Sequence, residues 1–209
     1  LTGCGGGGGS SPRGDVNSGN IPTLDAGTDL RPAVPSSRYA GTLADCALAD
    51  SANNSCTLVE LPLVGQDSEY PDIDAIMDRV VVSHDWMGVR FRQLLSAAPR
   101  DLLALMKGLT AIVIAADIRP SYYSSTTGAI YIDPAYLWLT NAEKATIDQA
   151  PDFRSGFDDE LAFVSLSRYV RGSEYAWDFY PLDGDSEREV DDILLSATRL
   201  LYHELAHVN

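Results

Sequence analysis

The chain has 209 residues, with 30 Asp and Glu against 15 Lys and Arg, and therefore a formal net charge of −15. Such an acidic protein repels phosphate backbones, so we expect no nucleic-acid partner. Hydrophobic residues make up 45% of the chain, which is enough for one ordinary domain with a real core. The longest apolar run, at residues 109–116, is too short to cross a bilayer as a helix.

The sequence Leu-Thr-Gly-Cys that ends at Cys4 resembles a lipobox, the last part of a bacterial lipoprotein signal peptide. A glycine run and a stretch rich in Ser, Pro, Gly, Asn and Asp follow it up to residue 37. A segment with so few large apolar side chains does not offset its ordering entropy, so residues 1–40 are predicted to be a flexible tether. The alternative is a chance cysteine in a low-complexity tail.

The lipobox resemblance implies that the rest of a signal peptide precedes this sequence and that Cys4 carries a lipid anchor. It places the protein in the bacterial cell envelope, attached to the membrane through lipid only. Gly5 stands where an Asp commonly retains lipoproteins at the inner membrane, so the outer membrane is the expected location. Because exported proteins meet an oxidising compartment, the remaining pair, Cys46 and Cys56, is predicted to form a disulfide without Cys4.

From residue 57 onward the sequence predicts a folded domain. Residues 58–64 form a short apolar run interrupted by Pro62, which is typical of an edge strand or an extended segment. Apolar residues at helical spacing predict helices at residues 73–82 and 86–97.

The middle of the chain is predicted to add a short helix and two strands. Pro99 is expected to start the helix and Gly108 to stop it. Residues 110–115 are β-branched and almost entirely apolar, a pattern typical of a strand buried on both faces. Residues 124–128 are expected to form a turn that leads into a second strand at residues 129–132.

The last part of the chain is predicted to contain two capped helices. Residues 140–143 and residues 186–189 both have the form of a capping box, which marks a helix start. Between them, residues 151–185 are aromatic-rich, acidic and expected to be irregular. After the second box, apolar residues recur at three- and four-residue spacing without Pro or Gly, so an amphipathic helix is predicted through Asn209.

This final helix carries an HExxH motif at residues 203–207. Residues four apart stand one turn above one another, so His203 and His207 project from one face and can bind one Zn²⁺. Glu204 lies about 100° around the helix, where it can take a proton from the zinc-bound water and later give it to the leaving amine. The alternative is an exposed helix end with incidental histidines.

The motif and the strand before it resemble the zincin zinc metallopeptidases, on the gluzincin side and more loosely the lethal-factor-like peptidases. The resemblance implies an α+β fold of helices and a small mixed sheet, with the motif on a long C-terminal helix. In that superfamily the edge strand of the sheet pairs with the substrate backbone, and Gly128, Ala129, Ile130 and Tyr131 are the candidates for it. Residues 41–209 would then be the N-terminal part of an incomplete catalytic domain.

The resemblance also implies a third zinc ligand, which we expect beyond Asn209 because the family places it downstream of the motif. Other features are assigned structural roles. His84 is expected to be a capping or surface residue, and the acidic loop at residues 183–187 a plain turn rather than a calcium site. Tyr122, Tyr123 and Tyr131 could donate a hydrogen bond to a reaction intermediate, but strand tyrosines usually only pack.

The sequence therefore predicts a lipid-anchored metallopeptidase of the bacterial envelope that uses Zn²⁺ to hydrolyse peptide or protein substrates. The alternative is a non-catalytic zincin-like surface lipoprotein with a binding or envelope role. The intact His203, Glu204 and His207 favour the enzyme, because a degenerate domain has no need of Glu204. A metal carrier would need more than three His and three Cys.

Overall fold

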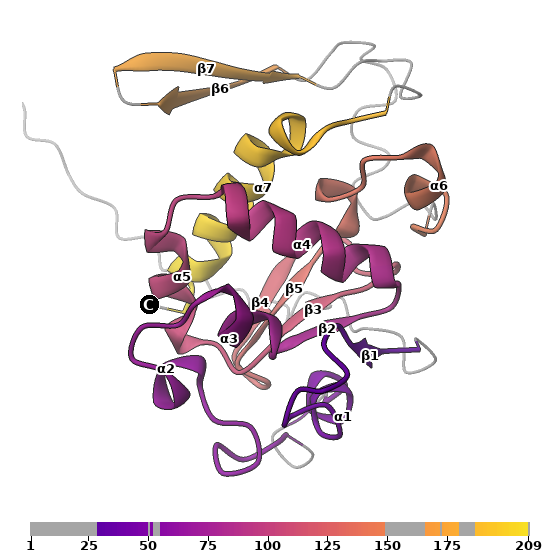
Figure 1. Cartoon of the computed structure of the whole chain (residues 1–209), viewed down its shortest axis with the longest axis vertical. Coiled ribbons are helices and arrows are strands. Elements are labelled where there is room, and N and C mark those ends of the chain that lie inside the picture. The colour runs from indigo at the N-terminus through magenta and orange to yellow at the C-terminus, as the bar shows by residue number, and fades with distance from the viewer. Residues whose placement is uncertain are drawn as a thin grey trace, which may run out of the picture.

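The computed structural model describes residues 29–49, 51, 55–148, 166–171, 173–179 and 187–208. They form a mixed α+β fold with a five-stranded sheet, a separate two-stranded hairpin and a long C-terminal helix (Figure 1). The strands are β1 (Arg31–Pro32), β2 (Val80–Val82), β3 (Ile112–Ile114), β4 (Tyr122–Ser124), β5 (Ala129–Ile132), β6 (Leu166–Arg171) and β7 (Glu174–Phe179). The helices are α1 (Leu43–Ala47), α2 (Val64–Asp67), α3 (Ile73–Met77), α4 (Asp85–Ala97), α5 (Asp101–Leu105), α6 (Asn141–Lys144) and α7 (Val190–Ala206), with 3-10 turns η1 (Met106–Gly108) and η2 (Pro134–Tyr136).

The sheet has the strand order β1-β2-β3-β5-β4. β2, β3 and β5 run parallel, while β1 and β4 pair antiparallel at the two edges. Side chains alternate between the faces of a strand, so each register row belongs to one face. Val80, Ile112 and Ile130 belong to a core with α4 and α7, and the next row, with Val81 and Val113, belongs to a core with α1. Both faces of the central strands are therefore buried.

The folded part of the chain begins earlier than the sequence predicts. Arg31 and Pro32 form β1, which pairs with Val82 and Val81, so the expected tether boundary at residue 40 is wrong. β1 is an edge strand, where a proline lacking an N–H removes no bond from the sheet interior. The Arg31 side chain also bonds to Asp85 at 2.8 Å, which links this edge to α4.

Two predicted elements before β3 have a different structure. Residues 58–60 form a turn and Val64 begins α2, so this segment is not an edge strand; the Thr57 N–H donates to the Glu60 side chain at 2.8 Å. The predicted helix at residues 73–82 is the short helix α3 followed by strand β2. Three consecutive valines favour a strand, and the parallel pairing with β3 provides the neighbour that they need.

The other predicted helices and strands agree with the structure where it describes them. Residues 86–97 lie within α4, and the segment between Pro99 and Gly108 contains α5 and η1. Thr140 accepts the Glu143 N–H and opens α6 with the expected capping box. Within the segment predicted to be irregular, β6 and β7 instead pair as an antiparallel hairpin.

Cys46 and Cys56 form a disulfide with their Cα atoms 5.3 Å apart, as the sequence predicts. Cys46 is buried in the core under α1, together with Leu43 and Tyr131. The Tyr131 hydroxyl donates to the Ala47 carbonyl at 2.7 Å, so α1 and the disulfide are fixed against β5. The expected lipid site at Cys4 lies outside the described residues.

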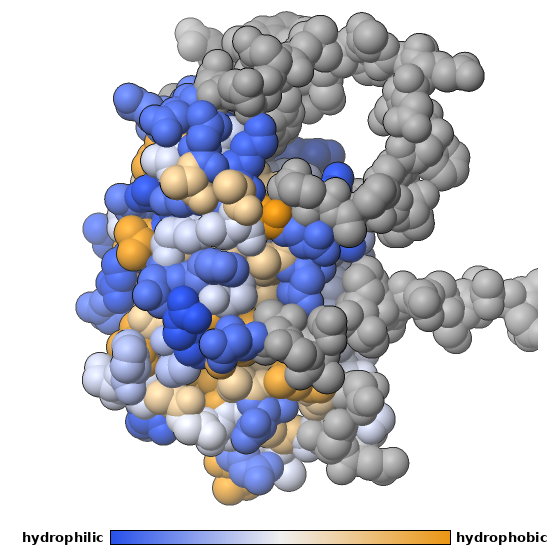
Figure 2. Space-filling model, turned by 90° about the vertical axis from the view of Figure 1, so that its right-hand side faces the viewer, coloured by the Kyte–Doolittle hydropathy of each residue, from blue (hydrophilic) through white to orange (hydrophobic). Residues whose placement is uncertain are grey.

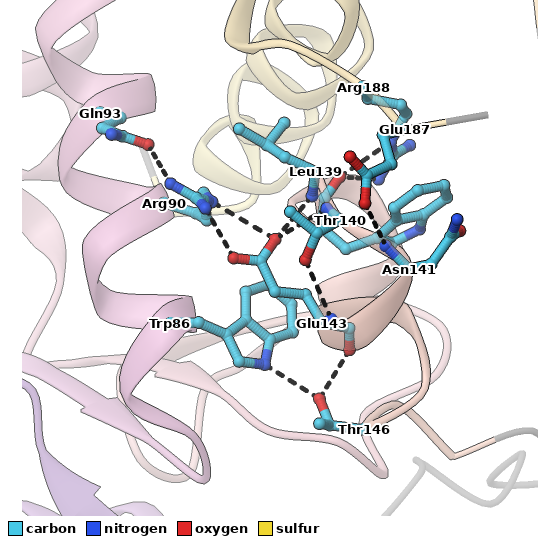
Figure 3. Close-up of polar contacts among 11 residues, drawn as sticks. Trp86, Arg90, Gln93, Leu139, Thr140, Asn141, Glu143, Thr146, Glu187 and Arg188 are labelled. Carbon is cyan, nitrogen blue, oxygen red and sulfur yellow. Dashed lines mark hydrogen bonds and ion pairs between the residues drawn. The ribbon is translucent and has the colours of Figure 1, made fainter. Parts of the chain in front are cut away.

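A polar network holds α6 against α4 (Figure 3). Arg90 of α4 forms an ion pair with Glu143 at 2.7 Å. Glu143 also accepts the backbone N–H groups of Leu139 and Thr140 at 2.8 and 3.1 Å. The buried carboxylate is thus paired in charge and in hydrogen bonds, which buried charges require.

Figure 2 shows hydrophilic residues over much of the face that it draws, with hydrophobic residues scattered between them. The large exposed apolar side chains of the described residues are few: Leu58, Val59, Tyr70 and Val89. Within the described ranges, no helix combines the length and the apolar character that crossing a bilayer requires.

Candidate functional site

The candidate site lies at the C-terminal end of α7. This helix buries an apolar stripe of Ile193, Ala197, Leu201 and Leu205 at three- and four-residue spacing. It begins with Glu189 as the N-cap and a capping box with Asp192, three residues later than the box predicted from Ser186. It ends at Ala206 and not at Asn209, so part of the motif lies on its last turn.

The two motif histidines lie side by side. His203 is in the last turn of α7 and His207 is its C-cap residue, and both are exposed. Their ring centres are 5.2 Å apart, and the ring planes are nearly perpendicular. The predicted projection of both imidazoles from one side of the helix is therefore present.

This spacing fits a shared metal ion. Two imidazoles that bind one tetrahedral zinc through nitrogens at about 2.0–2.1 Å have ring centres about 5 Å apart. The observed 5.2 Å is close to that value. The negative end of the α7 dipole lies at the same place and favours a cation there.

Glu204 points to the protein and not to solvent, since its residue is only 5% exposed. Burial raises the pKa of the Glu204 carboxyl above its usual range, while His203, His207 and the backbone N–H of Tyr123 oppose that shift. The carboxylate thus lies between the two imidazoles and strand β4. A group in this position can accept and return a proton beside a bound metal.

The strand next to the motif is β4 and not β5. β5 pairs with β3 on one side and with β4 on the other, so the predicted edge position of Gly128, Ala129, Ile130 and Tyr131 is wrong. Edge position depends on which strands pair across the fold, and this pairing is not encoded in a local pattern.

β4 and β5 form a hairpin, of which the sequence predicts the turn and β5 but not β4. Gly128 adopts φ +69° in the turn, a conformation that favours glycine, and its N–H donates to the Ser124 carbonyl at 2.8 Å. This turn places β4 on the free edge, close to α7. The Tyr123 N–H of this edge strand bonds to Glu204, so β4 and the motif are in direct contact.

A second contact fixes the last turn of α7. The Tyr202 hydroxyl donates to Asp101 of α5 at 3.1 Å, next to the first motif histidine. The sequence does not indicate Asp101 or the Tyr123 backbone as parts of the site, because neither belongs to a motif and both reach the site only through the tertiary fold. No local signal could have indicated them.

The remaining candidates behave mostly as expected. His84 is the N-cap residue of α4 without a capping bond from its side chain, and its Nδ1 lies 3.0 Å from Ser83 Oγ. Tyr122 and Tyr131 stack 4.5 Å apart, and burial raises the pKa of both phenols. They pack in the core with α1, on the face opposite to α7. Residues 183–186 of the acidic loop lie outside the described ranges.

In the part of the chain that the structure describes, no group of three His, Cys, Asp or Glu side chains is placed to hold a metal ion. His203 and His207 are two ligands where a catalytic zinc usually has three from the protein. Comparisons with protein-family models, with curated proteins and with solved structures gave no match.

Proposed function

We propose that the protein is a zinc-dependent hydrolase of peptide bonds, with the HExxH motif of α7 as its catalytic centre. The observation that carries the proposal is the arrangement of that motif: two imidazoles 5.2 Å apart on the open side, with a buried glutamate beside them. Incidental histidines at a helix end would not require a glutamate buried between them and an edge strand.

In this proposal His203 and His207 bind the metal, and Glu204 acts as general base and then as general acid. Zinc, when bound, polarises the scissile carbonyl and lowers the pKa of water to about 7. Glu204 accepts a proton from the attacking water and later gives it to the leaving amine. Its burial supports this role, because the carboxylate is held beside the two histidines and away from bulk water.

Two further parts of the site are proposals from the zincin resemblance. The first is a third protein ligand from residues that follow Asn209. The second is pairing of the substrate backbone with the free edge of β4, which replaces the earlier candidate β5. Support for the second comes from the position of β4 at the sheet edge beside α7.

The second candidate function is a non-catalytic zincin-like domain with a binding or envelope role. The presence of only two candidate zinc ligands at the motif among the described residues favours it. The two functions differ in what they require of Glu204, since a binding domain gains nothing from a general base.

Zinc binding is the first test, and the three histidines of the chain supply a matched set of variants. In the full-length protein, His203→Ala or His207→Ala should weaken zinc affinity by more than the roughly 10–100-fold that loss of an outer-shell partner costs. His84→Ala should leave the affinity unchanged, because His84 lies at the start of α4, where it contacts Ser83. Equal affinity in all three variants, measured by competition with a chelating dye, would contradict the metal site.

We also propose that the protein is held in the bacterial envelope by a lipid on Cys4, with the outer membrane as its location. The Cys46–Cys56 disulfide supports export, because such bonds persist in oxidising compartments. Labelling with a fatty-acid analogue should mark the full-length protein and not its Cys4→Ala variant. Label retained in that variant would rule out this anchor.

A further inference from the structure

A groove away from the HExxH motif is lined by residues of α3, α5 and the C-terminal half of α4. These three helices are labelled in Figure 1. We call the groove the α3–α5 groove. Its volume is about 870 Å³, within the range of about 300–1,000 Å³ that small-ligand pockets occupy. Its lining includes the apolar side chains of Ile73, Leu95 and Leu103 and the cations Arg100 and Lys107.

Some of the charges in the groove are already used within the protein. Arg92 forms an ion pair with Asp74 at 2.5 Å. Asp72 caps α3 by accepting the Ala75 N–H at 2.8 Å. These groups are therefore not the ones that a ligand would engage first.

Unlike Arg92, the cations Arg100 and Lys107 form no ion pair with a carboxylate of the described residues. In a chain with a net charge of −15, these two cations form a local site of positive charge that can attract an anion. The Lys107 stem is also held in place by packing on Gly65. A Cβ at Gly65 would lie 2.9 Å from the Lys107 Cβ, so only a glycine leaves room for this position of the stem.

We propose that the α3–α5 groove binds the C-terminal end of a peptide whose last side chain is apolar. Its carboxylate would lie between Arg100 and Lys107, where charge-assisted hydrogen bonds are strong. Its last side chain would cover Ile73, Leu95 and Leu103, which form the apolar part of the lining.

The acidic residues of the groove lining exclude some classes of anionic ligand. Glu69, Asp72 and Asp74 also line the groove and would repel a ligand with several negative charges, such as a nucleic acid or a polyphosphate. A peptide end carries a single carboxylate, which the two cations can balance, so it meets less repulsion from these groups than a polyanion does. This site needs neither zinc nor Glu204, so its failure would leave the proposed hydrolase untouched.

The test is calorimetric titration of the full chain with N-acetyl-Ala-Ala-Leu as the free acid and as the C-terminal amide. We expect one site for the acid, with binding of the amide weaker by about tenfold or more. Decanoate supplies a carboxylate and an apolar body without a peptide. Binding of decanoate as tight as that of the acid peptide would overturn the peptide assignment, and equal binding of acid and amide would overturn the carboxylate site.

Three variants localise the effect. Arg100→Gln and Lys107→Gln should each weaken binding of the acid peptide by about tenfold and leave binding of the amide unchanged. Arg100 is exposed, so its variant should fold normally, which the melting temperature checks. Arg199→Gln is the matched control, because Arg199 is an exposed cation of α7 outside the groove. Equal weakening by Arg199→Gln, or none by Arg100→Gln, would contradict the proposal.

Discussion

The two ends of α7 are built in opposite ways. At the N-terminal end, the Arg188 side chain donates to the carbonyls of Trp138 and Ala135 at 2.8 and 3.0 Å, and its guanidinium lies 3.6 Å from the centre of the Trp138 ring. The Arg188 N–H also donates to the Leu139 carbonyl at 2.7 Å. At the C-terminal end, His203 and His207 are exposed, and the polar contacts described above are the Tyr202–Asp101 bond and the Tyr123 N–H that Glu204 accepts.

The polar contacts of α7 are thus concentrated at its N-terminal end. The start of α7 is joined through residues 134–147 to Glu143 and Arg90, so it is fixed relative to α4 (Figure 3). The last turn keeps its apolar side on the core, and among the described residues its two imidazoles form no ion pair. A firm support at one end and open ligands at the other are what a metal site on a rigid element needs.

The largest effect on stability should come from the supported end. Glu143→Ala removes the ion pair with Arg90 and the side chain of the capping box, and should lower the free energy of unfolding by about 2–4 kcal/mol. Glu187→Ala is the control, since its carboxylate only accepts the Asn141 N–H at 3.4 Å and should cost less than about 0.5 kcal/mol. Urea unfolding curves of both variants measure the difference. Equal losses of unfolding free energy in the two variants would show that the Arg90–Glu143 network does not support the start of α7.

The same carboxylate should make stability depend on pH. Burial alone would raise the pKa of Glu143, but Arg90 and the N–H groups of Leu139 and Thr140 outweigh it and lower the pKa below its ordinary value. Its contribution is therefore complete above the ordinary glutamate pKa and is lost as pH falls through the lowered one, between about pH 5 and pH 2. The stability difference between the wild type and Glu143→Gln should shrink over this window. A constant difference would contradict the assignment.

A smaller loss of unfolding free energy is expected from Tyr202→Phe at the C-terminal end of α7. The change removes only the hydrogen bond to Asp101, which is exposed to solvent, and should cost about 0.5–1 kcal/mol. Double-mutant analysis with Asp101→Asn isolates the pair. A coupling energy near zero would mean that this bond does not hold the last turn.

The smallest effect should come from the histidines themselves in the absence of metal. His203→Ala and His207→Ala remove exposed side chains and should change stability by less than about 0.5 kcal/mol. With saturating zinc, the wild type should gain stability that the variants do not, because a ligand that binds only the folded state stabilises it. Thermal melts with zinc and with a chelator make this comparison.

Much of the fold could be predicted where a long pattern had only one interpretation. The stripe of α7 and the buried strand β3 are examples, because periodicity or β-branching continues over many residues. β2 could not be separated from α3, since Val80 continues the helical spacing of Ile73 and Ile76. The parallel neighbour β3, far along the chain, decides the outcome.

The candidate site was predicted only where it depends on a local pattern and not on contacts between distant segments. The spacing of His203 and His207 is local, so the sequence alone places both imidazoles on one side of the helix. The free edge at β4 depends on the hairpin turn at Gly128 and on pairing with β5. The contacts of Glu204 and Tyr202 depend on the packing of α7, which no short pattern encodes.

The most direct test of the central claim is the activity of Glu204→Gln in the full-length protein. The amide keeps the size of the side chain, so zinc content should remain near that of the wild type, while peptide hydrolysis should fall by about 100-fold or more through loss of the base. Zinc content by atomic absorption and turnover of a fluorogenic peptide are measured on the same sample. Normal turnover with zinc bound would contradict the role of Glu204 and, with it, the proposed mechanism.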